Sequence, residues 1–156
     1  MRALLEEIGL VGFVKTTGSK GLHVTVPLDG REPADAVRRF AFALGEALVA
    51  REPDLLTMEF RKEKRNGRLY VDLARNGYAQ TAVPPYAVRP RGGAPVATPV
   101  EWSEVESKDL RPDGFTMRTI FDRLDGADDP WKGMARRARS LDNARRKLGS
   151  RRELVR

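Results

Sequence analysis

The segment Lys15-Thr-Thr-Gly-Ser-Lys-Gly-Leu-His23 decides how this chain is interpreted. Its centre, Gly18-Ser-Lys-Gly21, has the composition of a tight turn between two β-rich stretches, which is typical of a β-hairpin. Successive backbone N–H groups in such a turn, together with a lysine, can surround an anion. The segment therefore predicts a hairpin that presents Ser19 and Lys20 to a phosphate group.

A second segment, Arg68-Leu-Tyr-Val-Asp-Leu-Ala-Arg-Asn76, alternates apolar and polar residues in the manner of a strand. Successive side chains of a strand point to opposite faces, so its apolar residues are expected on one buried face. These residues are Leu69, Val71 and Leu73. The opposite face then carries Arg68, Tyr70 and Asp72.

The same alternation applies to residues 22–27, which follow the hairpin turn. The residues expected to be buried are Leu22, Val24 and Val26. His23 and Thr25 are then turned outward. If both strands share one sheet, its polar face carries His23, Tyr70 and Asp72 beside the basic turn. Convergence of Lys20 and Asp72 on one side of a sheet would suit a phosphate substrate with a metal ion.

Length and composition indicate a cytoplasmic protein. The 156 residues are most simply one domain, which buries about two-thirds of its unfolded surface. The absence of cysteine excludes disulfides and thiolate metal sites, and suits a reducing compartment. No apolar run has the length of a signal core or a membrane span. We therefore expect a soluble, nucleoid-associated protein that makes no contact with a membrane.

The basic residues are concentrated towards the C-terminal end. The net charge is +7, and residues 131–156 hold ten Lys/Arg and two Asp/Glu. Two interpretations stay open, a solvated helix face or contact with nucleic-acid phosphates. The candidate phosphate contacts are Arg136, Arg137, Arg145, Arg146 and Lys147. Trp131 is the only aromatic residue of this stretch, so the stretch has no platform for stacking bases.

Hydrophobic periodicity and turn residues predict alternating helices and strands. Helices are expected over residues 2–8, from Pro33 to the stop at Pro53, near residues 102–105, and near residues 117–123. Strands are expected over residues 12–16, 22–26, 56–60, 68–73 and 81–83, with an irregular, proline-rich connection over residues 84–99. A final helix would bury Met134, Ala138, Leu141 and Leu148. Residues 149–156 would form a basic tail on a domain of residues 1–148.

Several common active sites are disfavoured by the sequence. It has neither a Walker loop nor a G-x-G-x-x-G motif after a strand. A zinc site is disfavoured by the single histidine and the lack of cysteine. A catalytic triad can be assembled from Ser19, His23 and Asp72, but no nucleophile elbow accompanies it.

Three segments together resemble the polymerase domain of bacterial DNA ligase D, a branch of the archaeo-eukaryotic primases that acts in non-homologous end joining. They are Phe13-Val-Lys-Thr-Thr-Gly-Ser-Lys-Gly-Leu-His-Val24, Arg68–Asn76 and Thr81-Ala-Val-Pro-Pro-Tyr-Ala-Val-Arg89. The resemblance continues through residues 93–102 and ends near residues 140–148. It covers nearly the whole chain, but only the C-terminal half of the family's domain. It implies an α+β fold, with a mixed, largely antiparallel sheet and flanking helices.

The resemblance implies template-dependent addition of nucleotides at broken DNA ends, with Mn²⁺ or Mg²⁺ as cofactor. Asp72 matches the third metal-binding carboxylate of the family, and His23 matches the histidine of its second motif. Both are thereby implied to be catalytic. Further residues match positions that bind the incoming nucleoside triphosphate, namely Thr17, Ser19, Lys20, Arg65, Arg75 and Arg89. At Thr17 the family usually has serine.

The family's first two metal ligands come from an Asp-x-Asp motif upstream of the hairpin, and no such motif precedes Val11 here. Two-metal phosphoryl transfer needs carboxylates that bridge both ions, so Asp72 alone does not suffice. We therefore expect this chain to bind nucleotide weakly and not to polymerise alone. It would work with an upstream polymerase half or a ligase domain. The alternative is a non-catalytic module that binds nucleic acid or a repair partner.

Each implied site residue also has a structural alternative. Asp72 can accept backbone hydrogen bonds at a turn, and His23 can be a half-buried group with a satisfied imidazole. Lys20 and Arg89 can be surface residues. Arg65 follows a run of four charged residues that can be a solvated turn.

Overall fold

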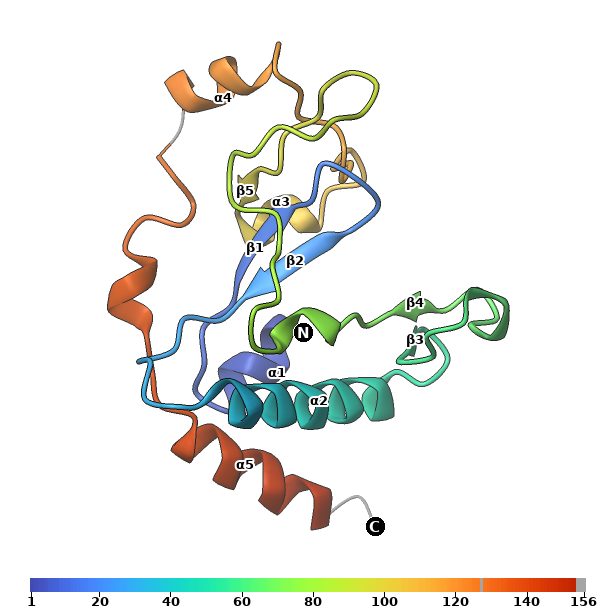
Figure 1. The fold of residues 1–156 in the computed structure, drawn as a ribbon, viewed down its shortest axis with the longest axis vertical. Coiled ribbons are helices and arrows are strands. Elements are labelled where there is room, and N and C mark those ends of the chain that lie inside the picture. Colours follow the sequence, from blue (N-terminus) through green and yellow to red (C-terminus); the bar gives the residue numbers. More distant parts are fainter. Residues whose placement is uncertain (127, 154–156) are drawn as a thin grey trace. The chain divides into compact units, whose positions relative to one another are not determined.

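The computed structural model describes residues 1–126 and 128–153, with side chains as far as residue 150 (Figure 1). The α-helices in this part of the chain are α1 (Arg2–Glu7), α2 (Ala34–Arg51), α3 (Trp102–Val105), α4 (Ile120–Gly126) and α5 (Asp142–Glu153). The strands are β1 (Phe13–Thr16), β2 (Leu22–Thr25), β3 (Leu56–Thr57), β4 (Leu69–Tyr70) and β5 (Pro99–Val100). Short 3-10 helices are η1 (Lys62–Lys64), η2 (Ala74–Asn76) and η3 (Met134–Arg137).

The chain folds as two compact units, each assembled from segments that are distant in sequence. The helical unit comprises Met1–Leu10, Leu28–Thr81 and Arg139–Arg156. The hairpin unit comprises Val11–Pro27 and Ala82–Ala138.

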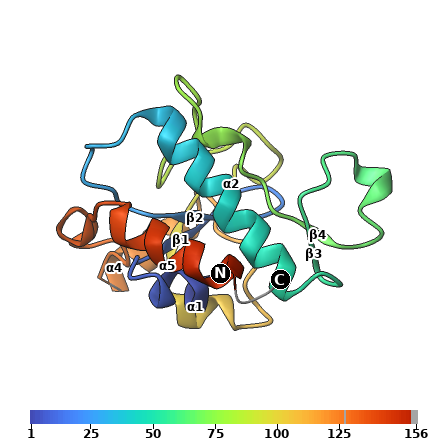
Figure 2. The same cartoon turned by 90° about the horizontal axis from the view of Figure 1, so that it is seen from below.

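The core of the helical unit lies around α2, which confirms the long helix predicted between Pro33 and Pro53. Helix α5 packs alongside α2 (Figure 2). The buried apolar residues of α1, α2, α5 and their flanks are Leu4, Leu5, Ile8, Leu10, Ala36, Phe40, Leu44, Leu48, Leu141, Ala144 and Leu148. Gly45 lets Leu73 approach α2 closely, because a Cβ at this position would overlap Leu73 Cδ1. At the surface, Arg51 of α2 pairs with Glu7 at 2.7 Å.

Strand β4 lies in the helical unit, where it pairs in parallel with β3. The prediction that it shares a sheet with the hairpin is therefore wrong, because the two-stranded β3–β4 sheet is separate from the hairpin's sheet. The predicted buried face is also wrong at Leu69, which is 69% exposed. Both strands are shorter than expected. Residues 81–83 form no strand, and Pro84 and Pro85 follow with no N–H to donate.

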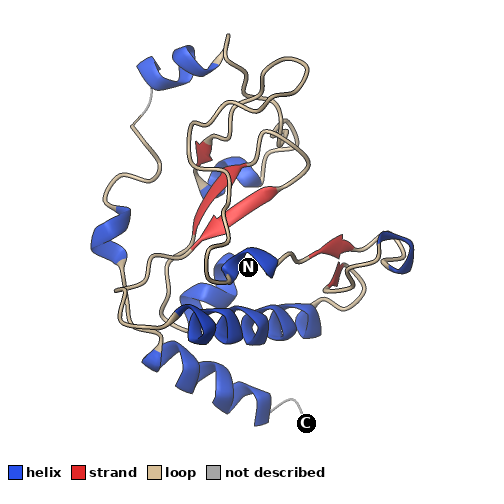
Figure 3. Ribbon diagram, viewed as in Figure 1, coloured by secondary structure: helices blue, strands red, loops and turns tan. Residues whose placement is uncertain are grey.

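The hairpin unit contains an antiparallel sheet in the order β2-β1-β5. Lys15 lies opposite His23 of β2 and opposite Pro99 of β5. The hairpin prediction is confirmed, and helix α3 forms where one was expected. The predicted burial of Leu22 is wrong, since this side chain is 37% exposed. The irregular connection predicted for residues 84–99 is found over residues 84–98, which run as loop with isolated bridges, whereas Pro99 belongs to β5 (Figure 3).

The single final helix predicted from Met134 onward is interrupted. The segment forms η3, then an extended stretch, then α5. Arg139 is extended because its carbonyl accepts a hydrogen bond from Asp29 N at 3.2 Å and its backbone forms a parallel bridge with Leu28. Ser140 Oγ then accepts from Asp142 N at 3.1 Å, at the start of α5. Helix α5 runs past residue 148 to Glu153, and residues 154–156 of the expected tail lie outside the described residues.

Candidate functional site

The hairpin turn is closed by the side chain of Thr17. Its Oγ1 donates to Gly21 O at 2.8 Å and accepts from Gly21 N at 3.3 Å, while Thr17 N donates to the same carbonyl at 3.1 Å. This hydroxyl therefore holds the turn closed through hydrogen bonds to Gly21, and the hydroxyl of a serine can do the same. Ser19 is half-buried and Lys20 is exposed at the tip.

Gly18 allows a second segment to pass directly against the turn. A Cβ at Gly18 would lie 2.6 Å from Arg89 Cγ and 3.3 Å from Pro95 O. Its φ of +61° is also strained for any residue with a side chain. The family-matched residues of the turn and Arg89 are therefore brought together, although they are far apart in sequence.

A short ladder across residues 86–97 holds Arg89 in this position. Arg89 N donates to Pro95 O at 2.7 Å, and Ala97 N donates to Ala87 O at 2.9 Å. Strand β1 is linked to the end of the same loop, because Thr16 N donates to Thr98 O at 2.8 Å. Arg89 is half-buried rather than a surface residue, and its Nε is buried without a hydrogen-bond partner among the described residues.

Lys15 is a buried cation in the same unit. The residue is 2% exposed, and its Nζ has no hydrogen-bond partner in the described part of the chain. Burial, and then the positive charge of Arg89, lowers the pKa of Lys15 to about 8. An unpaired buried charge is costly, so an anion beside Lys15 would stabilise its protonated form.

Sequence analysis assigned no role to Lys15, although the residue begins the motif. The register of the hairpin could have indicated a role for Lys15, because it pairs this residue with His23. Lys15 and His23 are direct partners in the antiparallel ladder, and direct partners place their side chains on the same face. Lys15 therefore shares a face of the sheet with His23, which is half-buried.

Asp72 lies in the helical unit, exposed and just after β4. Its Oδ1 accepts a hydrogen bond from Ala74 N at 3.0 Å, which is the turn-forming role considered as the alternative. Among the described residues, no three His, Cys, Asp or Glu side chains gather as a metal site requires. Asp72 can supply one carboxylate ligand, so this chain alone does not fit a two-metal centre. The convergence of Asp72 with Lys20 of the hairpin unit stays a prediction.

Arg65 and Arg75 also belong to the helical unit. Arg65 holds the β3–β4 connection: its Nε donates to Glu59 O at 2.9 Å and its Nη2 to Phe60 O at 2.7 Å. The guanidinium carbon lies 4.0 Å from the ring centre of Tyr70. Arg75 is exposed, with Nη1 donating to the Gln80 side chain at 3.2 Å. Arg65 therefore has a structural role here, beside any role in binding triphosphate.

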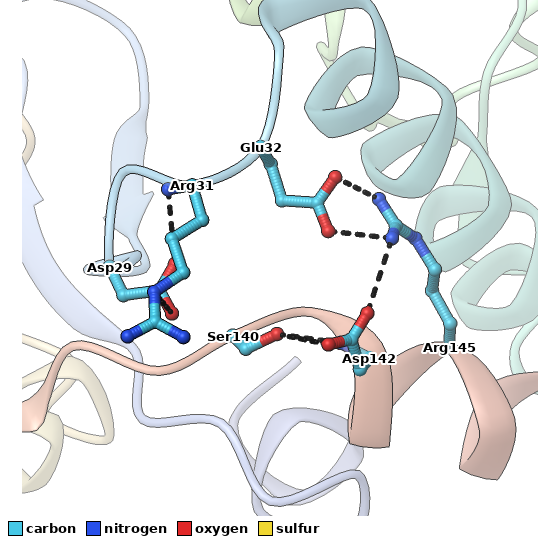
Figure 4. Close-up of polar contacts among 6 residues, drawn as sticks. All are labelled: Asp29, Arg31, Glu32, Ser140, Asp142 and Arg145. Carbon is cyan, nitrogen blue, oxygen red and sulfur yellow. Dashed lines mark hydrogen bonds and ion pairs between the residues drawn. The ribbon is translucent and has the colours of Figure 1, made fainter.

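The basic residues near the C-terminus are divided between the two units. Arg136 and Arg137 lie in η3 of the hairpin unit, whereas the other candidates lie on α5 of the helical unit. Arg145 donates through both terminal nitrogens to Glu32, at 2.7 and 2.8 Å, which raises its pKa (Figure 4). Its fork is thus occupied by a carboxylate. Lys147 Nζ donates to Glu7 O at 3.4 Å, whereas Arg146 and Arg137 are exposed.

Residues 1–131 match the family model of the LigD primase-polymerase domain. This chain belongs to that family. The polymerase domain of Mycobacterium tuberculosis ligase D, solved in complex with DNA, has a TM-score of 0.80 and 32% identity, covering 88% of this chain and 47% of that chain. This match confirms the α+β fold and agrees with a resemblance to half of the family's domain.

Curated relatives support the same assignment. The multifunctional non-homologous end joining protein LigD of Pseudomonas aeruginosa is 37% identical over 149 residues, which is 94% of this chain and 18% of that protein. The bifunctional protein LigD of Bacillus subtilis is 30% identical over 125 residues, or 80% of this chain and 20% of that protein. The chain thus spans about a fifth of the length of these relatives. In the described residues, no helix has the length and apolar character to cross a membrane.

Proposed function

We propose that this chain is the nucleotide-binding part of a primase-like polymerase that adds nucleotides at DNA ends during non-homologous end joining. Its family and the names of its relatives support the pathway. The observation that carries the proposal is the seating of Arg89 against the Gly18 turn. The turn and the arginine there provide backbone N–H groups and cations for the triphosphate.

The residues of the hairpin unit divide the work of binding. Lys20, at the exposed tip, reaches the outer phosphates as a mobile point charge, whereas Arg89 is preorganised beneath the turn. Thr17 keeps the turn closed and Ser19 presents its hydroxyl to the phosphates. His23, on the strand after the turn, lies on the face of the sheet that also carries Lys15.

In the helical unit, Asp72 would contribute one metal ligand, and Arg65 and Arg75 would contribute positive charge towards the triphosphate. A divalent ion held by a full ligand set would supply activation of the attacking hydroxyl and charge stabilisation of the leaving pyrophosphate. Among the residues that the structure describes, no three His, Cys, Asp or Glu side chains gather into such a set. We therefore infer that the chain binds nucleotide but needs additional carboxylates for polymerisation.

Exposed basic residues support a second contact, with the phosphate backbone of a DNA end. Arg137 and Arg146 are exposed, and the structural neighbour from M. tuberculosis was solved with DNA. Each phosphate contact adds affinity that weakens as salt rises. The same observation fits the alternative function, a non-catalytic module that binds nucleic acid.

Nucleotide titration distinguishes the two functions. The parent chain, Arg89→Ala and the exposed control Arg118→Ala are titrated with ATP, with and without Mn²⁺, by calorimetry. Loss of one charged hydrogen-bond donor costs about 1.5–3 kcal/mol, so Arg89→Ala should weaken binding roughly tenfold or more. The control should bind like the parent. Equal affinity for all three proteins would contradict the triphosphate site.

Primer extension tests the inferred need for further carboxylates. The purified chain, given a primed template and Mn²⁺, should add no nucleotides. Extension at the rate of a complete polymerase domain would overturn this inference while leaving nucleotide binding intact.

A further inference from the structure

We propose that Lys15 and Arg89 form a buried site for one phosphate group. Binding of the phosphate favours the protonated form of Lys15, which takes up the proton from the buffer. Identification of the phosphate as part of a nucleotide rests on the function proposed above. The site itself rests on the geometry of the hairpin unit.

Lys15 is placed by the middle of the sheet. Its backbone lies in β1, between His23 of β2 and Pro99 of β5, so the side chain leaves from the central strand rather than from an edge. The residue is 2% exposed, and no described residue accepts a hydrogen bond from its Nζ.

Arg89 is held near the lysine by two independent constraints. Its N–H is bound to Pro95 O at 2.7 Å, and its side-chain stem lies against Gly18. Its buried Nε, like Lys15 Nζ, lacks an acceptor in the described part of the chain. Lys15 and Arg89 therefore each have one buried hydrogen-bond donor without an acceptor, Lys15 Nζ and Arg89 Nε.

The groups around Lys15 do not compensate its charge. The residues opposite Lys15 on the neighbouring strands are His23 and Pro99, and neither carries a negative charge. Trp131 approaches β1 from another segment, with Nε1 donating to Val14 O at 2.9 Å and its ring against Phe13. Of the two acids of that segment, Asp129 accepts from Tyr86 Oη at 3.2 Å and Trp131 N at 3.0 Å, and Asp128 accepts from Lys132 Nζ at 3.1 Å.

A phosphate group suits these two donors better than a neutral ligand does, because both donors belong to cations and lack acceptors. It brings negative charge and several acceptor oxygens, and both lysine and arginine bind phosphate oxygens through short charged hydrogen bonds. Without an anion, Lys15 loses its proton at a lower pH than an exposed lysine does, in agreement with the lowering of its pKa to about 8. Binding the anion opposes this loss of the proton, because the charged lysine now has a partner.

This coupling predicts affinity that depends on pH. A ligand that binds only the protonated lysine loses affinity as pH rises through the pKa of the empty site, which is about 8. From pH 7.5 to 9.5 the affinity should fall about twentyfold. Phosphate monoesters finish ionising near a pKa of about 6, but the last proton of tripolyphosphate leaves within this window, so each pH profile is taken as the difference between the parent chain and Lys15→Arg.

The test measures the binding of ATP and of inorganic tripolyphosphate by calorimetry, without metal, at pH 7.5, 8.5 and 9.5. It compares the parent chain, Lys15→Arg, Lys15→Met and the exposed control Lys108→Met. Two buffers with different ionisation enthalpies count the protons taken up, which should be about three-quarters of a proton per ligand at pH 8.5. The parent and Lys108→Met should show the fall in affinity.

The arginine variant separates charge from proton exchange. Lys15→Arg keeps the positive charge but does not titrate below pH 12, so its affinity for ATP should be flat across this range, and its affinity for tripolyphosphate should follow only the ionisation of that ligand. Lys15→Met should bind weakly and also without the contribution of Lys15 to the pH dependence. Circular dichroism of each variant confirms that it is folded before its affinity is interpreted.

The possible failures are distinguishable. ATP binding that requires Arg89 but is unchanged in Lys15→Met would overturn the lysine site and leave the proposed function standing. Tripolyphosphate binding with the predicted pH profile, but no ATP binding, would support the anion site and contradict the nucleotide function. Affinity of the parent that is flat between pH 7.5 and 9.5, or no binding of either ligand, would overturn the inference.

Discussion

Replacing Lys15 by methionine is expected to stabilise the hairpin unit at neutral pH. Methionine keeps the length of the buried stem and removes an ammonium group that has no hydrogen-bond partner among the described residues. The pKa of Lys15 falls from 10.5 to about 8 on folding, mainly through burial and then through Arg89. One pKa unit corresponds to about 1.4 kcal/mol, so the charged lysine costs the folded state roughly 3 kcal/mol at pH 7.

The sign of the pH dependence follows from proton binding. Between pH 8 and pH 10.5 the unfolded chain holds the Lys15 proton more tightly than the folded chain does. The free energy of unfolding of the parent therefore gains from this group as pH rises, whereas Lys15→Met lacks the group. The advantage of the variant should shrink from roughly 3 kcal/mol at pH 7 to a few tenths near pH 10.5.

Urea unfolding followed by tryptophan fluorescence measures this difference. Both tryptophans lie in the hairpin unit and donate to β1 or its approach, Trp102 to Gly12 O at 2.7 Å and Trp131 to Val14 O at 2.9 Å. Lys108→Met, at an exposed position, is the control and should follow the parent at every pH. A Lys15→Met variant less stable than the parent by a constant amount from pH 7 to 10 would refute the reasoning.

Three further perturbations test other contacts. Gly18→Ala should lower the free energy of unfolding by about 1–3 kcal/mol, because the φ of Gly18 is positive and a Cβ there would meet the side chain of Arg89. Gly92→Ala is the control and should have little effect in the same urea titration, because nothing lies within 4 Å of a Cβ at this position. Glu32→Gln breaks the bidentate pair with Arg145 and should lower the melting temperature slightly, since this partly exposed pair contributes about 1 kcal/mol or less to the free energy of unfolding. An unchanged melting temperature in low salt would show that the pair does not help to hold α5 in place. Arg65→Ala should speed amide exchange in residues 59–70, and unchanged exchange would argue against its structural role.

The elements that sequence predicted well depend on local pattern. Helix α2 has a sustained apolar period and is bounded by prolines, so no distant contact was needed to predict it. The hairpin is likewise encoded by its own turn residues. Strand β4 was misplaced because its partner is decided by tertiary pairing. Alternation within Arg68–Asn76 indicates a strand but does not indicate which strand lies next to it.

Two other differences also arise from contacts that are distant in sequence. The break before α5 depends on the pairing of Arg139 with Leu28, which no pattern near Arg139 reveals. For the candidate site, matching of motifs identified Arg89 but not its position against Gly18. Lys15 was within reach of prediction, because the length of the hairpin turn sets the register that pairs it with His23.

The segments of the two units alternate along the chain, and the helical unit includes the last of them. This order determines where the chain can be cut without damage to a unit, and which unit can form first. The hairpin unit has all its segments once residue 138 is present, whereas the helical unit still lacks Leu141, Ala144 and Leu148 of its core. During synthesis from the N-terminus, the hairpin unit can therefore be complete before α5, which packs against α2, has been made. A nick or stop codon near residue 140 would spare one folding unit and leave the other with an open apolar surface.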